Sequence, residues 1–348
     1  MYQTLYDIIS MVTTCLIEKT MVETKCIFCE KINDNVLIRE NGYNGIKCSQ
    51  CGLIYVSPRP SAEEIVNLYG HDMAHVSAKS HISSRFPKRL HAKHNLGIIK
   101  KFIKKGTMLE IGTGAGFFLN EARKNSFEVY GIELNNALTD FVNTKLGIPC
   151  KVSPLETSLF GEKKYDIIYH CDVISHFSDP ITEFCKMNSM LNSKGLVVFE
   201  TGNFGDVEEK YYKHFKKFQL PDHLFFFSED NLKQLLTKTG FEFINIYRYS
   251  ILPQLISNKI LEHIVCLLKP GVYTHKEDKK HDFTNTSLHP RSIFFNLCRF
   301  FKKAYSYAFN ITYKYLYSCL SYFMRYKIGY MVPKKGRPQT VIVIARKK

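Results

Sequence analysis

The sequence predicts a doubly wound α/β fold with a small metal-binding module in front of it. Three observations lead to this prediction. Apolar segments of strand length alternate with helical segments from about residue 93 onwards. A glycine-rich loop follows the first of these strands, and four cysteines form two close pairs near the amino terminus. A chain of 348 residues, 45% of them hydrophobic, is long enough for about two domains with a sizeable core.

The cysteine module is expected over residues 24–56, after an amino-terminal extension at residues 1–23. Two residues separate Cys26 from Cys29, and two separate Cys48 from Cys51. Two thiolates at this spacing bind one ion from a tight turn, and a second pair completes a closed tetrahedral site. The spacing therefore predicts a zinc ribbon whose structural zinc supplies folding energy. Two disulfides, or free thiols, are the alternative.

The next segment, residues 57–94, is expected to be a helical linker or lid. Ser61 opens a helix, with Glu63 and Glu64 in its first turn, where the helix dipole favours acidic groups. Residues 70–92 are rich in His, Ser, Lys and Arg and show little periodicity.

The α/β core is expected over residues 95–249, with a final core strand at 339–348. Strands are predicted at 107–112, 128–133, 147–152, 165–171, 195–201, 241–249 and 340–348, and helices at 116–125, 135–145, 180–192 and 228–238. Strands separated by helices pair in parallel through right-handed crossovers. The core therefore reads as a seven-stranded, doubly wound sheet.

The loop after the first strand indicates the kind of ligand. Gly112, Gly114 and Gly116 let the chain turn sharply and expose main-chain N–H groups. The spacing does not fit a dinucleotide fingerprint, because Phe117 stands where that pattern needs glycine or alanine. Glu110, just before the loop, repels pyrophosphate and suits an ammonium and a sulfonium. Glu133, at the end of the second strand, can accept both ribose hydroxyl hydrogens.

Four segments carry a family resemblance: LEIGTGAGFFL, YGIELN, YDIIYHCDVISHFSDP and GLVVFET. Together they resemble class I S-adenosylmethionine-dependent methyltransferases, whose sheet is Rossmann-like. The resemblance implies S-adenosylmethionine as cofactor, with the glycine loop on its methionine part, Glu133 on the ribose and Leu134 on the adenine. The cofactor-binding residues it implies are Glu110, Gly112, Thr113, Gly114, Gly116, Phe117, Glu133, Leu134, Leu155, Glu156, His170, Cys171 and Asp172.

The segment CGLIYVSPRPSAEEIVNLY, which starts at the last of the four cysteines, resembles the ribbon that precedes the methyltransferase domain in many bacterial enzymes, sugar C-methyltransferases among them. Those sugar enzymes usually carry a longer C-terminal domain. The implied acceptor is a small molecule or a glycan-type intermediate.

Two histidines are the catalytic candidates. His176 follows the fourth strand, and His223 lies in the loop before the helix at 228–238. A histidine near neutral pKa can remove a proton from a hydroxyl or an acidic carbon while the methyl group is transferred. For both, a purely structural hydrogen bond within the loop is the alternative. Asp179 and Asp222 are expected at helix entries or turns.

Residues 250–338 are predicted to be a basic, aromatic helical insertion. Residues 251–348 hold 18 Lys and Arg against 4 Asp and Glu, which accounts for most of the net charge of +16. Within it, residues 291–330 combine a polar helical stripe with a wide aromatic face. Such a helix suits peripheral contact with an anionic membrane. Packing against the core, or forming a dimer interface, is the alternative.

Two further functions remain open at this point. The ribbon and the basic segment could grip RNA or another nucleic acid. A non-catalytic zinc adaptor on a methyltransferase fold is the other.

The reduced cysteines and the lack of a signal-peptide pattern predict a cytoplasmic protein, with peripheral contact at the inner membrane surface if the insertion binds lipid. No transmembrane helix is predicted.

Overall fold

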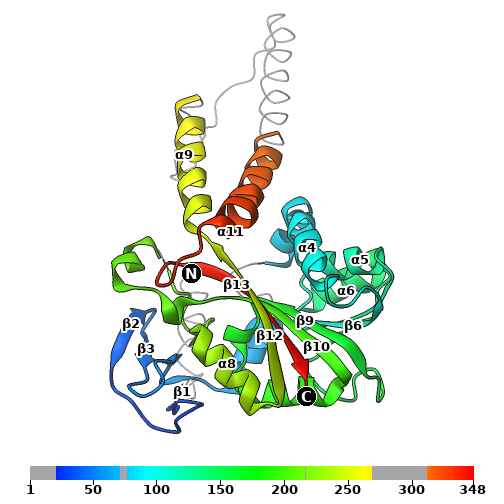
Figure 1. Ribbon diagram of the computed structural model, residues 1–348, viewed down its shortest axis with the longest axis horizontal. Helices are drawn as coiled ribbons and strands as arrows, with labels where there is room; N and C mark the ends of the chain where they lie inside the picture. Colours follow the sequence, from blue (N-terminus) through cyan, green and yellow to red (C-terminus); the bar gives the residue numbers. More distant parts are fainter. Residues whose placement is uncertain (1–20, 71–76, 216, 269–311) are drawn as a thin grey trace, which may run out of the picture.

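The computed structural model describes residues 21–70, 77–215, 217–268 and 312–348. Its centre is a seven-stranded sheet in the order β12-β13-β10-β9-β6-β7-β8 (Figure 1). The seven strands are β6 (Gly106–Ile111), β7 (Phe127–Glu133), β8 (Cys150–Val152), β9 (Tyr165–Cys171), β10 (Leu191–Gly202), β12 (Phe241–Ser250) and β13 (Gln339–Lys347). The inner strands pair in parallel, and β13 runs antiparallel to both of its neighbours. The predicted α/β fold class is confirmed.

The third strand is shorter than predicted. A strand was expected over residues 147–152, but β8 begins at Cys150. Gly147 instead ends the preceding helix in a left-handed conformation, and its N–H bonds the Asn143 carbonyl. A glycine in this conformation is a common helix stop.

Helices cover both faces of the sheet, as a doubly wound fold requires. They are α4 (Arg85–Ile99), α5 (Phe117–Arg123), α6 (Asn136–Leu146), α7 (Pro180–Met190) and α8 (Glu229–Lys238). Side chains of α4, α5 and α6 share one buried cluster with Met108, Ile167 and Val198. Side chains of α7 and α8 share another with Leu109 and Ile168. Neighbouring residues of a strand thus belong to the hydrophobic clusters on opposite faces of the sheet, because side chains alternate along a strand.

The segment expected as a linker or lid contains three helices. They are α2 (Ala62–Gly70), α3 (Ala78–Ser83) and the start of α4. Ala92, Leu96 and Ile99 lie buried on the inner face of α4 at helical spacing. The boundary expected at residue 94 therefore falls inside a helix that packs on the sheet.

A second sheet, four-stranded and antiparallel, lies beside the core in the order β11-β4-β3-β2. Three of its strands come from the cysteine module, namely β2 (Val36–Glu40), β3 (Tyr43–Lys47) and β4 (Ile54–Val56). The fourth, β11 (Phe225–Phe226), comes from the loop between β10 and α8. A short pairing of β1 (Met21–Val22) with β5 (Arg59–Pro60) completes this region.

Two helical segments project from the sheet at the end of β12 (Figure 1). They are α9 (Leu252–Leu268) and the helical residues 312–331, which end in a π-helical turn (Met324–Ile328) and α11 (Gly329–Met331). We call these two segments the arm. Of the aromatic segment 291–330, residues 291–311 lie outside the described residues. No helix in the described ranges is both long and apolar enough to cross a bilayer.

Candidate functional site

A cavity of about 750 Å³ lies at the carboxyl ends of the parallel strands. It is bounded by the loops that follow β6, β7, β9 and β10, by α2 and by the loop before β11. In open α/β sheets, ligands bind at this edge. The volume is within the usual range of about 300–1,000 Å³ for small-molecule sites.

The glycine loop closes one wall of the cavity, and its glycines are required by geometry. Gly112, Gly114 and Gly116 all have left-handed backbone conformations, with φ of 69°, 52° and 68°. A Cβ atom on Gly112 would lie 2.7 Å from the Val173 side chain, and one on Gly116 would lie 2.8 Å from that of Val142. Any other residue at these two positions would force the loop or these neighbouring side chains to shift.

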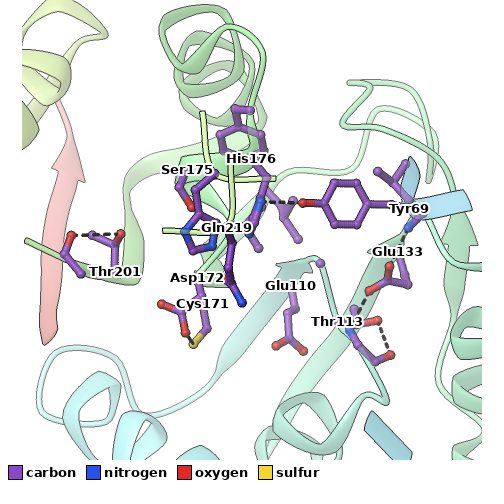
Figure 2. A pocket seen from close by; sticks show the side chains of 18 of the residues that line it. Tyr69, Glu110, Thr113, Glu133, Cys171, Asp172, Ser175, His176, Thr201 and Gln219 are labelled. Carbon is purple, nitrogen blue, oxygen red and sulfur yellow. Dashed lines mark hydrogen bonds between the residues drawn. The ribbon is translucent and has the colours of Figure 1, made fainter. Parts of the chain in front are cut away.

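Two carboxyl groups face this loop (Figure 2). Glu133 accepts hydrogen bonds from the N–H groups of Gly114 (2.7 Å), Leu134 (2.9 Å) and Asn135 (3.1 Å). Glu110 is only 4% exposed, and its Oε2 atom has no hydrogen-bond partner among the described residues. Burial raises the pKa of both carboxyl groups, and the charge of Glu133 raises that of Glu110 further. A cation placed between them would reverse this effect.

Most of the other expected cofactor residues also border the cavity. Those that line it are Thr113, Phe117, Leu134, Leu155, Cys171 and Asp172. Gly116 and Glu156 do not line it. Gly116 is the N-cap residue of α5 and packs close to α6.

The placement expected for His170 is wrong. Its ring lies fully buried on the opposite side of β9, stacked on Phe199 with ring centroids 5.0 Å apart, and contacts Phe177 and Phe184. Alternation along the strand explains this, because it puts Cys171 on the cavity side and His170 on the other. Burial lowers the pKa of His170 to about 3, so this imidazole is neutral.

The two candidate catalytic histidines meet in the cavity, with ring centroids 4.8 Å apart. Nδ1 of His176 lies 2.6 Å from the Tyr69 hydroxyl (Figure 2). The same atom lies 2.7 Å from the Asp222 backbone carbonyl. The Tyr69 hydroxyl also donates to the Asp222 carboxylate. A carbonyl oxygen only accepts, so Nδ1 of His176 carries a hydrogen, and in the neutral ring Nε2 holds the lone pair.

The charge of Asp222 reaches His176 as well. Burial lowers the pKa of His176, but the hydrogen bond and charge of Asp222 outweigh burial and leave that pKa above its usual value. Asp179 caps α7 as expected, accepting from the N–H groups of Ile181 and Thr182. Asp222, expected in the same kind of role, instead belongs to the histidine cluster.

Sequence reasoning missed several residues of this site. Tyr69 is one, because nothing in the pattern of α2 distinguishes a tyrosine that faces a cavity from one that packs on it. Gln219 also lines the cavity, from a left-handed backbone conformation with φ of 65°. Three aromatic residues that contact one another also line the cavity, namely Phe204, Phe215 and Phe218. The cluster of aromatic residues around 204–227 was the available signal.

A buried polar cluster lies beside the cavity at the end of β10. The carboxylate of Glu200 is fully buried and accepts from His91 (2.6 Å), Asn95 (2.6 Å), Arg325 (3.0 Å) and Tyr326 (3.2 Å). These partners hold its pKa well below the usual range, in spite of burial. Two of them come from the arm, so the arm reaches the edge of the site.

The four cysteines come together as their spacing predicts. Their sulfur atoms all lie within 4.8 Å of one another, and Sγ of Cys26 is 3.5 Å from Sγ of Cys51. That separation is too long for a disulfide, whose sulfurs lie about 2.05 Å apart. It is close to the distance of about 3.8 Å that Zn–S bonds of about 2.3 Å give in a tetrahedron. Glu30 and Gly52, which follow the two pairs, both have left-handed backbone conformations.

The ribbon also holds the loop that carries the second histidine. Glu40 accepts from the backbone N–H groups of Phe218 (3.1 Å) and Leu220 (2.8 Å). The N–H of Val56 bonds the carbonyl of Leu224, the residue after His223. Asn231, in the first turn of α8, donates to the carbonyl of Cys51 at 3.0 Å. The cysteine module and the cavity are thus one connected structure.

Part of the chain is similar in sequence to a known family. Residues 81–246 match a family model described as "Methyltransferase domain". A search of curated proteins finds no match. Among solved structures, phosphoethanolamine N-methyltransferase 2 from Haemonchus contortus, in complex with S-adenosyl-L-methionine, is 15% identical with a TM-score of 0.48. That alignment covers 84% of this chain but only 62% of the Haemonchus chain. Coclaurine N-methyltransferase, bound to N-methylheliamine and SAH, is 12% identical with a TM-score of 0.42, over 82% of this chain and 78% of that one.

The matched residues are those that build the parallel strands, the glycine loop and most of the cavity wall. β13, the one strand of the central sheet that runs against the others, is inserted between β10 and β12, outside the matched range. Residues 81–246 are therefore similar to methyltransferase domains over just under half of the chain.

Proposed function

We propose that the protein transfers a methyl group from S-adenosylmethionine to a small-molecule or glycan-type acceptor. The observation that carries the proposal is the pair Glu110 and Glu133 on either side of the glycine loop. Glu110 presents a buried oxygen atom with no described partner, and burial raises the pKa of both carboxyl groups. Such a site favours a cationic nucleoside over an anionic dinucleotide.

The residues present fit the cofactor. Glu133 would hold the ribose hydroxyls, Leu134 and Leu155 would pack on the adenine, and Glu110, the glycine loop and Asp172 would hold the methionine part. S-adenosylmethionine supplies a methyl group on a sulfonium, which carries the electrophilic carbon of the reaction. The chain's own residues need only bind, orient and exclude water around it.

Acceptor activation is assigned to the histidine cluster. The hydrogen on Nδ1 of His176, held by the Asp222 carbonyl, leaves Nε2 as a proton acceptor. The proton of the acceptor would pass to Nε2 of His176, directly or through the neighbouring ring of His223, and Asp222 would stabilise the His176 imidazolium that results. Tyr69 fixes the orientation of the cluster.

Zinc is assigned to the ribbon. Four thiolates would fill all positions of a tetrahedral ion, so this zinc would hold structure and would not touch the acceptor. Zinc binding would stabilise the sheet that contains β11. Through this sheet it would also stabilise the loop that carries His223.

Calorimetry with S-adenosylmethionine tests the proposal directly, with NAD as the comparison ligand. We expect binding of S-adenosylmethionine and none of NAD. The variant Glu133→Gln should bind S-adenosylmethionine about tenfold or more weakly, because a charge-assisted hydrogen bond contributes about 1.5–3 kcal/mol. Glu128→Gln, on the exposed face of the same strand, is the control and should bind like the unaltered protein. NAD binding at the same site would refute the assignment.

A further inference from the structure

Large exposed apolar side chains gather on the arm. Ile256, Ile260 and Ile264 are 58%, 56% and 44% exposed and lie four residues apart along α9, so they share one helix face. The second segment of the arm adds Leu316, Phe323, Tyr330 and Met331, each at least 50% exposed. Scattered exposed apolar residues are ordinary, but a row of them on a projecting element marks an interaction surface.

The charge on the arm is positive. The exposed cations Lys259, Lys314 and Lys327 lie on the same two segments as the apolar row. Among the described residues of the arm, Glu262 is the single acidic side chain. The whole chain carries a net charge of +16, so a second copy would bring like charge to this surface. Apolar side chains among lysines complement an anionic lipid surface.

The arm begins at the edge of the sheet where the cavity lies. β12 runs parallel to the other core strands, so its carboxyl end, where α9 begins, lies at the same edge as the ends of β9 and β10. Ile251, at the start of α9, and Pro338, just before β13, both line the cavity. Their backbones are joined by a 3.2 Å hydrogen bond.

The cavity wall is aromatic near His223, whose ring contacts Phe226. Phe204, Phe215 and Phe218 contact one another there, with ring centroids 5.0–5.8 Å apart. This lining suits an acceptor with an apolar body rather than a fully polar sugar or a base paired in a duplex. The acceptor end of the cavity and the exposed face of the arm thus share the same chemistry.

We propose that the arm docks the protein on the surface of an anionic lipid bilayer, and that the acceptor is an amphipathic molecule drawn from that surface. The docking depends only on the arm. The identity of the acceptor rests in addition on the proposed methyl transfer.

Vesicle sedimentation tests the docking. The full-length, zinc-loaded protein is mixed with vesicles of phosphatidylcholine alone, or with one quarter phosphatidylglycerol. We expect binding to the anionic vesicles, weakened at least tenfold in the triple variant Ile256→Ser, Ile260→Ser, Ile264→Ser. The control is Ile32→Ser, since Ile32 is 62% exposed in the ribbon and should not affect binding. A double variant, Lys259→Gln with Lys327→Gln, should lose the preference for anionic over neutral vesicles.

Three results would overturn the docking proposal. The first is equal binding of the triple variant and the unaltered protein, and the second is no binding to anionic vesicles at low salt. The third is a dimer in light scattering that the triple variant abolishes, because the arm would then join two copies of the chain. Calorimetry with S-adenosylmethionine on the same variants keeps the two proposals apart, since arm variants should leave that affinity unchanged.

Discussion

Glu110 shows how a single buried carboxyl group can be poised for a cation. Its burial and the nearby Glu133 raise its pKa well above the ordinary value. A carboxyl group whose pKa is raised by folding destabilises the folded state as the pH rises above its unfolded value. A bound cation reverses this effect, because it favours the charged form.

This gives a prediction for the pH dependence of cofactor binding. Binding of S-adenosylmethionine should release protons, and its affinity should rise with pH through the range in which Glu110 titrates. Calorimetry in buffers of different ionisation enthalpy measures the protons released. The variant Glu110→Gln should bind more weakly and release fewer protons, while its melting temperature without cofactor should rise. A proton release unchanged in Glu110→Gln would show that another group is responsible.

At the residue scale, the sequence predicted the groups whose backbone context was unambiguous. Glu110 and Glu133 lie in strands of clear pattern, and Gly112 and Gly114 follow the first of these strands; the structure brings all four to the cavity. The placement of His170 was predicted wrongly because a residue near the end of a strand can face either side of the sheet. A shift of one position reverses the face. Tyr69 and Gln219 were missed because their positions depend on long-range packing that no local pattern encodes.

At the scale of elements, the shared sheet β11-β4-β3-β2 is the main departure from the sequence prediction. The sequence indicated a ribbon ending near residue 56 and a separate core. The sheet takes its edge strand from Phe225–Phe226, about 170 residues later. Two residues of a phenylalanine run carry no strand signal of their own, because their pairing partner lies in another part of the chain.

The ribbon gives a prediction about metal and stability. The purified protein should contain about one zinc per chain, and Cys48→Ser should lower both the zinc content and the melting temperature, the latter by about 5 °C or more. Cys185→Ser is the matched control, because Cys185 is exposed and distant in sequence from the four-cysteine cluster. Metal analysis and thermal unfolding measure both effects. A metal-free protein with unchanged stability would contradict the zinc assignment.

Glu40 gives a second prediction at this scale. It holds the backbone of residues 218–220 from the ribbon side, so Glu40→Gln should disturb the His176 and His223 cluster while leaving the glycine loop intact. We expect shifted histidine signals in ¹⁵N NMR and altered titration of these rings, with unchanged affinity for S-adenosylmethionine. Glu30→Gln, beside the cysteine cluster and without such contacts in the hydrogen-bond network described, serves as the comparison. Identical histidine spectra would remove Glu40 from a positioning role.

At the scale of the whole molecule, the arm and the core are joined through Glu200. Arg325 is two residues from the exposed Lys327, yet its guanidinium reaches both Glu200 and the Thr340 hydroxyl of β13. The sequence indicated a basic amphipathic segment with a polar stripe over residues 291–330, which includes Arg325. It could not show that one cation of that stripe turns inward, since the buried carboxylate lies about 125 residues earlier in the chain.

Removing this cation should be costly. Arg325→Ala leaves Glu200 buried with fewer compensating partners, and we expect a loss of about 3 kcal/mol in the free energy of unfolding. Lys327→Ala, exposed on the same turn, should change it by less than about 0.5 kcal/mol. Urea denaturation compares the two variants. Because the pKa of Glu200 is lowered by folding, its stabilisation is present above the unfolded carboxyl pKa and is lost as the pH falls below it.

The pairing of β4 with β11 also sets a limit on how the protein can be divided. The family match begins at residue 81, and cutting there would yield the entire parallel sheet. The truncated protein would lack β4, the strand that pairs with Phe225 and Phe226. The phenylalanines next to His223 would then be exposed. An exposed, unpaired edge strand of this kind promotes aggregation. The boundary of the family match, at residue 81, therefore differs from the boundary of the part that can fold by itself, which must include β4.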